Sequence, residues 1–282
     1  MKKITVILLS MVTIIFFSSL VYYGMRHSRG TPVPVKKQEL IVLNAPFINR
    51  SIDLARGISL NIWDSLPSKE IELEYQLMAI PWGKSLVSPI YVKAFHNKKD
   101  IYFYIEWKDD TQDDSLDSGT FSDASAVMFP MDDDVQPSTL MMGFLGGANI
   151  WHWKASQDRE FWLNERLEKK VYVDFHYPFE EEELFPTSKD VPSSAVNDLA
   201  AIRVGTITKK EIQRVHGRGM RRENMWYVVF KRSLRARDLE SDAVFKLNGK
   251  KKLCAFAVWN GATKDRGGRK SISDWVELYL RL

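Results

Sequence analysis

The sequence predicts a mainly β protein: an antiparallel β-sandwich with few short helices, preceded by one N-terminal transmembrane helix. Two aromatic and β-branched runs, Ile90–Phe95 and Ile101–Trp107, flank the polar loop HNKKD, which is the pattern of a β-hairpin. Similar short runs recur along the chain, whereas long amphipathic helices are rare. With 282 residues and 45% hydrophobic content, the chain can build one domain with a sizeable core.

Residues 1–30 are expected to form a membrane anchor. Ile4–Gly24 is uncharged throughout, and a helix of this length spans roughly 32 Å, enough to cross a hydrocarbon core. A secretory signal peptide is the competing interpretation, since Lys2 and Lys3 form a suitable n-region. The segment, however, contains no Ala and no small-x-small cleavage site near its end. Basic residues on both sides of the span leave its orientation open under the positive-inside rule.

A short tether and one long domain follow the anchor. Residues 31–39 contain Pro32 and Pro34 and are expected to be extended. The domain covers residues 40–282, and Gln157–Lys169 is its candidate short helix or irregular crossing segment. Beyond the hairpin, strands are expected at Ala124–Phe129, Val171–Phe175, Ala201–Ile207, Trp226–Lys231, Leu253–Trp259 and Trp275–Leu282.

Composition excludes several classes of function. The net charge of +4 comes from the basic residues before position 31, so the neutral remainder gives no reason to propose a nucleic-acid partner. The lone Cys254 excludes an intramolecular disulfide, an all-cysteine iron–sulfur cluster and a covalently attached c-type heme. No GxSxG, HExxH or phosphate-loop motif is present, and the acidic run at 109–119 lacks the spacing of a calcium loop. The chain is therefore expected not to be a catalyst in its own right.

The stretch Gln136–Ala155, QPSTLMMGFLGGANIWHWKA, favours a large flat apolar ligand. Its glycines allow close approach of a ligand to the backbone, and a thioether such as that of Met142 can ligate heme iron or copper. The alternative interpretation is core filling, which is the commoner role of Met and Trp clusters.

Several motifs, taken in order, resemble a known family. They are SDASAVMFP at 122–130, MMG followed by NIWHWKA, WYVVFKRSL at 226–234, and AFAVWNG with GGRKSISDW near the C-terminus. Over residues 55–282 the chain resembles the heme b-binding gamma subunits of type II dimethyl sulfoxide reductase-family molybdoenzymes. That group includes ethylbenzene dehydrogenase, dimethyl sulfide dehydrogenase, selenate and chlorate reductases, and related nitrate/nitrite oxidoreductases. The resemblance implies the same sandwich and one non-covalent heme b.

The resemblance also implies an axial ligand pair of one Met and one Lys. The matching positions are Met142, with Met141 as the register alternative, and Lys270. A lysine must lose its proton to coordinate iron, which from a pKa of ~10.4 costs about 4.6 kcal/mol at pH 7. Gly267 and Gly268 permit a close approach, while Ile272 and Trp275 can shield the amine from water.

His152 is the rival ligand, because His is the commonest proximal partner of heme iron. In an extended NIWHWKA segment, His152 points away from Trp151 and Trp153. These two tryptophans, with Lys154, are expected to line or brace the heme pocket.

The leading hypothesis is a membrane-anchored heme b electron-transfer subunit with its body on the extracytoplasmic, periplasm-like side. It would relay electrons between the iron–sulfur subunit of a molybdenum enzyme and an external cytochrome c, with the catalytic molybdenum subunit in the same complex. The first alternative is a heme-free membrane tether for a nitrate/nitrite oxidoreductase-type complex. The second is a carbohydrate-binding β-sandwich whose tryptophans, Trp151 or Trp153, stack on sugar rings.

Overall fold

The computed structural model describes residues 40–76, 84–115, 119–132, 147–164, 192–202, 206–247 and 249–282. All of them belong to one compact unit, Leu40–Leu282. The expected anchor at 1–30, the tether at 31–39 and the strand Val171–Phe175 lie outside the described residues. No helix within the described ranges is long and apolar enough to cross a membrane.

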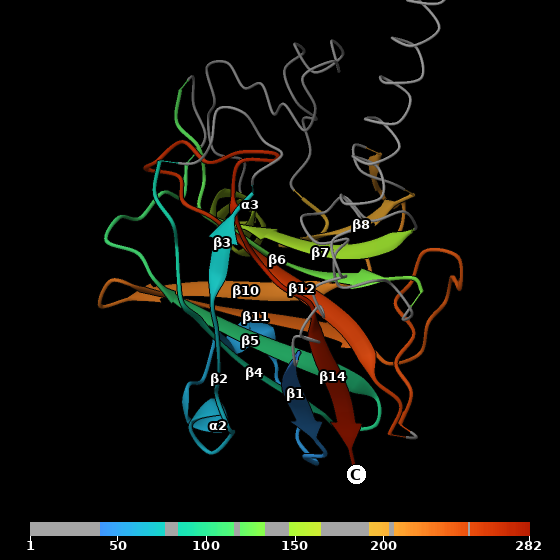
Figure 1. The fold of residues 1–282 in the computed structure, drawn as a ribbon. Coiled ribbons are helices and arrows are strands. Elements are labelled where there is room, and N and C mark those ends of the chain that lie inside the picture. Colours follow the sequence, from blue (N-terminus) through green and yellow to red (C-terminus); the bar gives the residue numbers. More distant parts are fainter. Residues whose placement is uncertain are drawn as a thin grey trace, which may run out of the picture. The chain divides into compact units, whose positions relative to one another are not determined.

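The described part of the domain is mainly β, as expected, and consists of two sheets that stack as layers (Figure 1). The larger sheet has its main path in the order β1-β14-β12-β6-β7-β8-β9, with β13 paired to β12 and β3 paired to β13. The smaller sheet has the order β10-β11-β5-β4-β2.

The strands of the larger sheet are β1 (Ile41–Pro46), β3 (Leu73–Tyr75), β6 (Ala124–Pro130), β7 (Ala148–Lys154), β8 (Val196–Ala201), β9 (Ile207–Lys209), β12 (Lys252–Trp259), β13 (Ser271–Ser273) and β14 (Val276–Arg281). Those of the smaller sheet are β2 (Lys69–Ile71), β4 (Ile90–His96), β5 (Asp100–Lys108), β10 (His216–Arg222) and β11 (Met225–Ser233). The helical segments are η1 (Leu54–Arg56), α2 (Asn61–Asp64) and α3 (Ala155–Leu163).

The predicted hairpin is confirmed, because β4 and β5 pair antiparallel around residues 97–99. Asn97 closes the turn: its Oδ1 accepts hydrogen bonds from the backbone N–H groups of Lys99 and Asp100 at 3.0 and 2.7 Å. Asn side chains favour such turns because they can bond to the backbone two or three residues ahead. The local sequence of this segment is therefore enough to specify the hairpin.

Two expectations about strands need correction. The pairing is not purely antiparallel, since β1 runs parallel to β14 and so joins the two ends of the domain. The predicted strand Ala201–Ile207 is also wrong: β8 ends at Ala201, and Ile202 is a bend with 78% of its side chain exposed. The real strand lies earlier, where Asn197 and Asp198 obscured its apolar character although both are buried.

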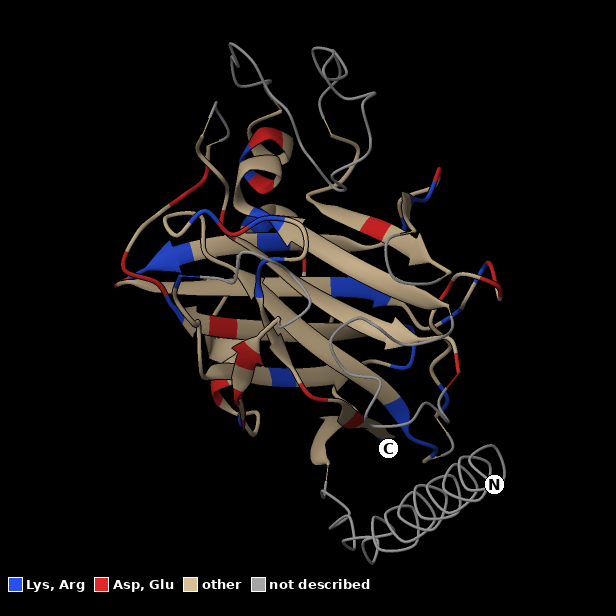
Figure 2. Ribbon diagram, turned by 45° about the horizontal axis from the view of Figure 1, so that its top comes forward, with Lys and Arg blue, Asp and Glu red and all other residues tan. Residues whose placement is uncertain are grey.

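The core between the sheets is dominated by aromatic side chains. Trp151 packs edge-on against Phe103 of β5, and Trp153 packs edge-on against Trp107 and Trp226, with ring centroids 5.2–6.3 Å apart. Such edge-to-face pairs add to the stabilisation from burial. Most strand residues are neither acidic nor basic (Figure 2), although single charged residues lie in mid-strand, such as Lys93 of β4 and Arg218 of β10.

Helix α3 places the buried carboxyl of Asp158 against this core. Its Oδ1 accepts from the indole N–H of Trp153 at 2.7 Å and from the backbone N–H of Gly219 at 2.8 Å. Gly219 has no room for a side chain, because an added Cβ would overlap the Trp153 ring. Burial raises the pKa of Asp158 from 3.8 to about 7, although both hydrogen bonds oppose the shift.

Replacing Asp158 with Asn should flatten the dependence of stability on pH. Because the folded chain holds this proton more tightly than the unfolded chain, the stabilisation is complete below pH ~4 and is lost as pH rises through about 7. The free energy of unfolding of the parent, minus that of D158N, should fall by up to about 1.4 kcal/mol per pH unit in that window. Urea unfolding of both proteins from pH 4.5 to 8 measures this difference. A difference in the free energy of unfolding that stays constant with pH would contradict the raised pKa of Asp158.

Candidate functional site

The face of the larger sheet that points away from the smaller sheet is smooth and apolar. On β6 and β12, Ala126 pairs with Ala257 and Met128 with Ala255, and residues paired across strands share a face. All four are 3–7% exposed and belong to a hydrophobic cluster separate from the core between the sheets. Alternation of small residues in ASAVMFP and LCAFAVW therefore produces a flat surface rather than an interlocked one.

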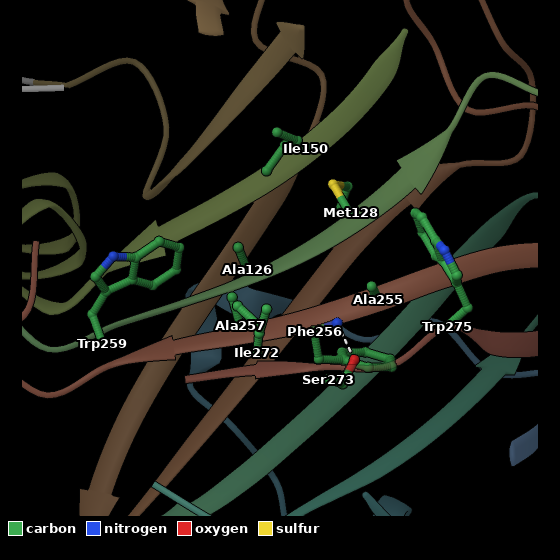
Figure 3. A pocket seen from close by; sticks show the side chains of 10 residues that line it. All are labelled: Ala126, Met128, Ile150, Ala255, Phe256, Ala257, Trp259, Ile272, Ser273 and Trp275. Carbon is green, nitrogen blue, oxygen red and sulfur yellow. Dashed lines mark hydrogen bonds between the residues drawn. The ribbon is translucent and has the colours of Figure 1, made fainter. Parts of the chain in front are cut away.

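Two tryptophans stand at opposite ends of this face (Figure 3). Trp259 ends β12, and Trp275 follows β13. Together with the paired small residues they enclose a hollow that is also lined by Ile150, Phe256, Ile272 and Ser273. We call this surface the alanine face.

The hollow over the alanine face is about 20 Å³, room for roughly one water molecule. Pockets for organic ligands usually measure about 300–1,000 Å³. The hollow in this structure is therefore smaller than a porphyrin needs.

Lys270 lies at the edge of the alanine face, directly before β13. Its side chain is buried, with 6% exposed, and its carbonyl oxygen accepts a hydrogen bond from the backbone N–H of Gln76 at 3.2 Å. Among the described residues, no Asp or Glu forms an ion pair with its amine. Burial alone lowers the pKa of Lys270 from 10.5 to about 7. A substantial fraction of the amine is therefore neutral near pH 7, the form that can coordinate a metal.

His152 and Lys270 share Trp259 as a neighbour. The Lys270 Nζ lies 4.9 Å from the centroid of the Trp259 ring, and the His152 ring lies 4.8 Å from the same ring. His152 pairs with Ala126 and is therefore on the alanine face. Two of the nitrogen ligands considered from the sequence thus contact Trp259, which lines one end of the hollow, although neither lines the hollow itself. Met142 and Met141 fall outside the described residues.

Trp151 and Trp153 do not line this hollow. Both are fully buried in the core between the sheets, on the opposite side of β7 from His152. They can support β7 from behind, but they cannot stack on a sugar ring, as the carbohydrate-binding alternative requires. Lys154 shares the side of His152 and lies at the end of β7, opposite Ala124.

Other polar clusters do not form a second site. Within the described ranges, no group of three or more His, Cys, Asp or Glu side chains could hold a metal ion. The run at 109–115 instead makes local bonds: Asp109 Oδ1 accepts from the backbone N–H and the hydroxyl of Thr111. The single Cys254 is buried, and burial raises the pKa of its thiol.

Sequence reasoning proposed Lys270 as a site residue but missed the alanine face and the contact between Trp259 and Lys270. The A-x-A spacing in two separate segments was the available signal. It becomes informative only once β6 and β12 are known to be neighbours, because either segment alone is an ordinary buried strand.

A family model described as ethylbenzene dehydrogenase matches residues 61–271, which include Lys270 and the paired alanines of β6 and β12. The chain belongs to the ethylbenzene dehydrogenase family. The resemblance drawn from the sequence motifs is thereby confirmed. The match also includes His152 and Trp259, whereas Ile272, Ser273 and Trp275 of the hollow lie just beyond it.

Three named relatives are 24–25% identical to this member of the ethylbenzene dehydrogenase family over the aligned regions. A Haloferax mediterranei protein provisionally named respiratory nitrate reductase heme subunit ORF7 is 25% identical over 76% of this chain and 64% of its own length. The chlorate reductase gamma subunit of Ideonella dechloratans is 25% identical, covering 77% and 76%. The dimethylsulfide dehydrogenase gamma subunit of Rhodovulum sulfidophilum is 24% identical, covering 76% and 71%. The matched region thus spans less than two thirds of the Haloferax relative.

Among solved structures, a family 9 carbohydrate-binding module from Caldicellulosiruptor kristjanssonii in complex with glucose aligns with 85% of this chain and 95% of its own. The TM-score is 0.43 and the sequence identity 10%. This likeness supports no statement about function.

Proposed function

We propose that this chain is a membrane-anchored heme b electron-transfer subunit of a molybdenum oxidoreductase complex. The observation that carries the proposal is the buried amine of Lys270, which has no acidic partner among the described residues and sits at the edge of a flat apolar face. Family membership and relatives named as heme or gamma subunits support it. As part of this proposal, the chain is a non-catalytic subunit, which agrees with the relatives' names.

The apolar lining of the hollow and the nearby amine of Lys270 are chemically suited to a heme, although the volume of the hollow is smaller than a porphyrin needs. Lys270 would supply one axial ligand and Met142 the other, as the family resemblance implies. When bound, heme b supplies a single-electron redox couple. The chain itself would hold the porphyrin against Ala126 and Ala257, keep water from the amine, and present a nitrogen that is already largely desolvated. Met ligation generally raises the reduction potential, which suits electron delivery to a high-potential acceptor.

The partners in this proposal are the iron–sulfur and molybdenum subunits of one complex and an external cytochrome c. Residues 1–30 would anchor the chain, with the body on the extracytoplasmic, periplasm-like side. Electrons would pass one at a time through the heme between the iron–sulfur subunit and the cytochrome.

A heme-free tether remains the second candidate, and the small volume of the hollow favours it. In that case the family fold would serve only to bind partner subunits, and the alanine face would stay closed. It predicts co-purification with the complex without iron in this chain.

Native purification from membranes distinguishes the two candidates. The electron-transfer proposal predicts a low-spin b-type absorption spectrum, one heme per chain, and co-purification of molybdenum and iron–sulfur subunits. Deleting residues 1–30 should release the assembly from the membrane and leave the spectrum unchanged. An iron-free chain that still carries its partners would contradict electron transfer and support the tether.

A further inference from the structure

Trp259 contacts Lys270 in two ways. Its indole N–H donates a hydrogen bond to the carbonyl oxygen of Gly267 at 3.0 Å, three residues before the lysine. Its ring lies 4.9 Å from the Lys270 amine. One side chain therefore fixes both the backbone that leads to Lys270 and the end of its side chain.

The loop between β12 and Lys270 is closed by its own bonds. Asp265 donates its backbone N–H to the carbonyl of Asn260 at 3.1 Å and accepts the N–H of Asn260 on Oδ2 at 3.2 Å. The buried carboxylate of Asp123 accepts the N–H of Gly261 at 2.9 Å. Gly261 has no room for a Cβ, which would overlap the carbonyl oxygen of Phe121. These contacts hold the start of the loop.

The second half of the loop depends on Trp259. Arg269 bonds back to Arg266 within the turn, and Gly267 takes a positive φ of 53°, a conformation in which glycine is favoured. Among the described contacts, the bond from Trp259 ties this half of the loop back to β12. Loss of that indole would free Gly267 from β12, while the backbone of Lys270 would still be held by its bond from Gln76.

The same ring also restrains His152. The imidazole lies against Trp259 with centroids 4.8 Å apart and an interplanar angle of 39°. His152 and Lys270 belong to different strand segments but share one aromatic neighbour. Imidazole is the commoner heme ligand. For Lys270 to be the ligand, some feature of the structure must therefore favour its amine over the imidazole of His152.

We propose that Trp259 is a positioning residue that presents the amine of Lys270 to the cofactor and holds the imidazole of His152 away from it. This inference rests on the proposed function. Trp259 does not ligate the metal; it decides which of two nearby nitrogen atoms reaches it.

The test uses the full-length chain loaded with heme b and records ferric electron paramagnetic resonance and absorption spectra with the midpoint potential. The variants are W259F, W259A, H152Q, the double variant W259A/H152Q and K270A. Trp63→Phe is the matched control, since Trp63 is also buried but belongs to a separate hydrophobic cluster away from the hollow. Thermal unfolding of each variant separates ligand exchange from loss of fold.

W259A should replace the parent low-spin signal with that of an imidazole-ligated heme, and W259A/H152Q should turn high-spin. W259F keeps a ring but loses the bond to Gly267, so heme affinity should fall about 3–10-fold with the parent signal retained. H152Q and W63F should match the parent. If W259A destabilises the fold, W259F and H152Q still test whether Trp259 positions the amine of Lys270.

A parent spectrum in W259A, or loss of the low-spin signal in H152Q alone, would overturn the positioning role. An unchanged heme affinity of W259F would also contradict the positioning role of Trp259. A parent spectrum in K270A is a separate result: it would remove Lys270 as ligand and with it the proposed function.

Discussion

Substituting Lys270 with Ala is expected to abolish the low-spin b-type spectrum of the heme-loaded protein. The variant lacks the nitrogen that would fill one axial position, so the iron should become high-spin and heme affinity should fall strongly. Loss of an outer-shell partner of a metal ligand typically costs roughly 10–100-fold in affinity, and loss of the ligand itself should exceed that. Heme titration followed by absorption, with pyridine hemochrome analysis, measures both effects.

The fold should survive this change, because the amine of Lys270 is buried without an acidic partner among the described residues. Lys270→Leu fills the space left by the side chain and serves as a second variant. Lys252→Met is the matched control: Lys252 is also buried in this sheet, but its amine donates to the carbonyl of Pro130 at 2.6 Å. Equal loss of heme in K252M and K270A would show that the site had collapsed rather than lost a ligand.

Arg232→Met should lower the free energy of unfolding by about 3 kcal/mol, the lower end of the range for breaking a buried ion pair. Arg232 is 2% exposed and lies 3.5 Å from a carboxylate oxygen of Asp242, and it also donates to the carbonyl of Ala243 at 3.0 Å. The loss is kept near the lower end because Lys210 still pairs with Asp242 at 2.7 Å. Chemical denaturation at pH 7 measures the difference.

Lys251→Met is the control for the effect of a charge change. Lys251 pairs with Glu277 at 3.0 Å on the surface, with side chains 43% and 21% exposed. Surface pairs contribute about 0–1 kcal/mol, so K251M should be close to the parent. Similar losses in R232M and K251M would mean that the buried network around Asp242 contributes little to stability.

Much of the fold was predictable because local signals and tertiary structure agree. The hairpin β4–β5 has apolar alternation on both sides of an Asn-centred turn, and β11, β12 and β14 lie within two residues of their predicted bounds. In each case the side chains that favour an extended backbone also fill the core. The local sequence pattern is then sufficient to predict the strand.

Strands β8 and β10 could not be predicted in the same way. Asn197 and Asp198 of β8 are buried, and the latter is bonded to Asn149 and paired with Lys210. The sequence HGRGMRR of β10 contains no apolar run, and Gly219 is there because Trp153 occupies the space of its side chain. Both strands are stabilised by residues that are distant in the sequence. The sequence pattern within each strand is therefore not enough to predict it.

The sequence by itself determined that the chain is a β-rich domain, and its motif order led to the family and to Lys270. Only the tertiary structure decided which face of the sheet could hold a flat ligand and which residues surround the amine. It placed Trp151 and Trp153 in the core between the sheets and brought His152, Trp259 and Lys270 together from three segments. The physical reason is that alternation along a strand separates two faces, but only the pairing of distant strands determines what each face meets.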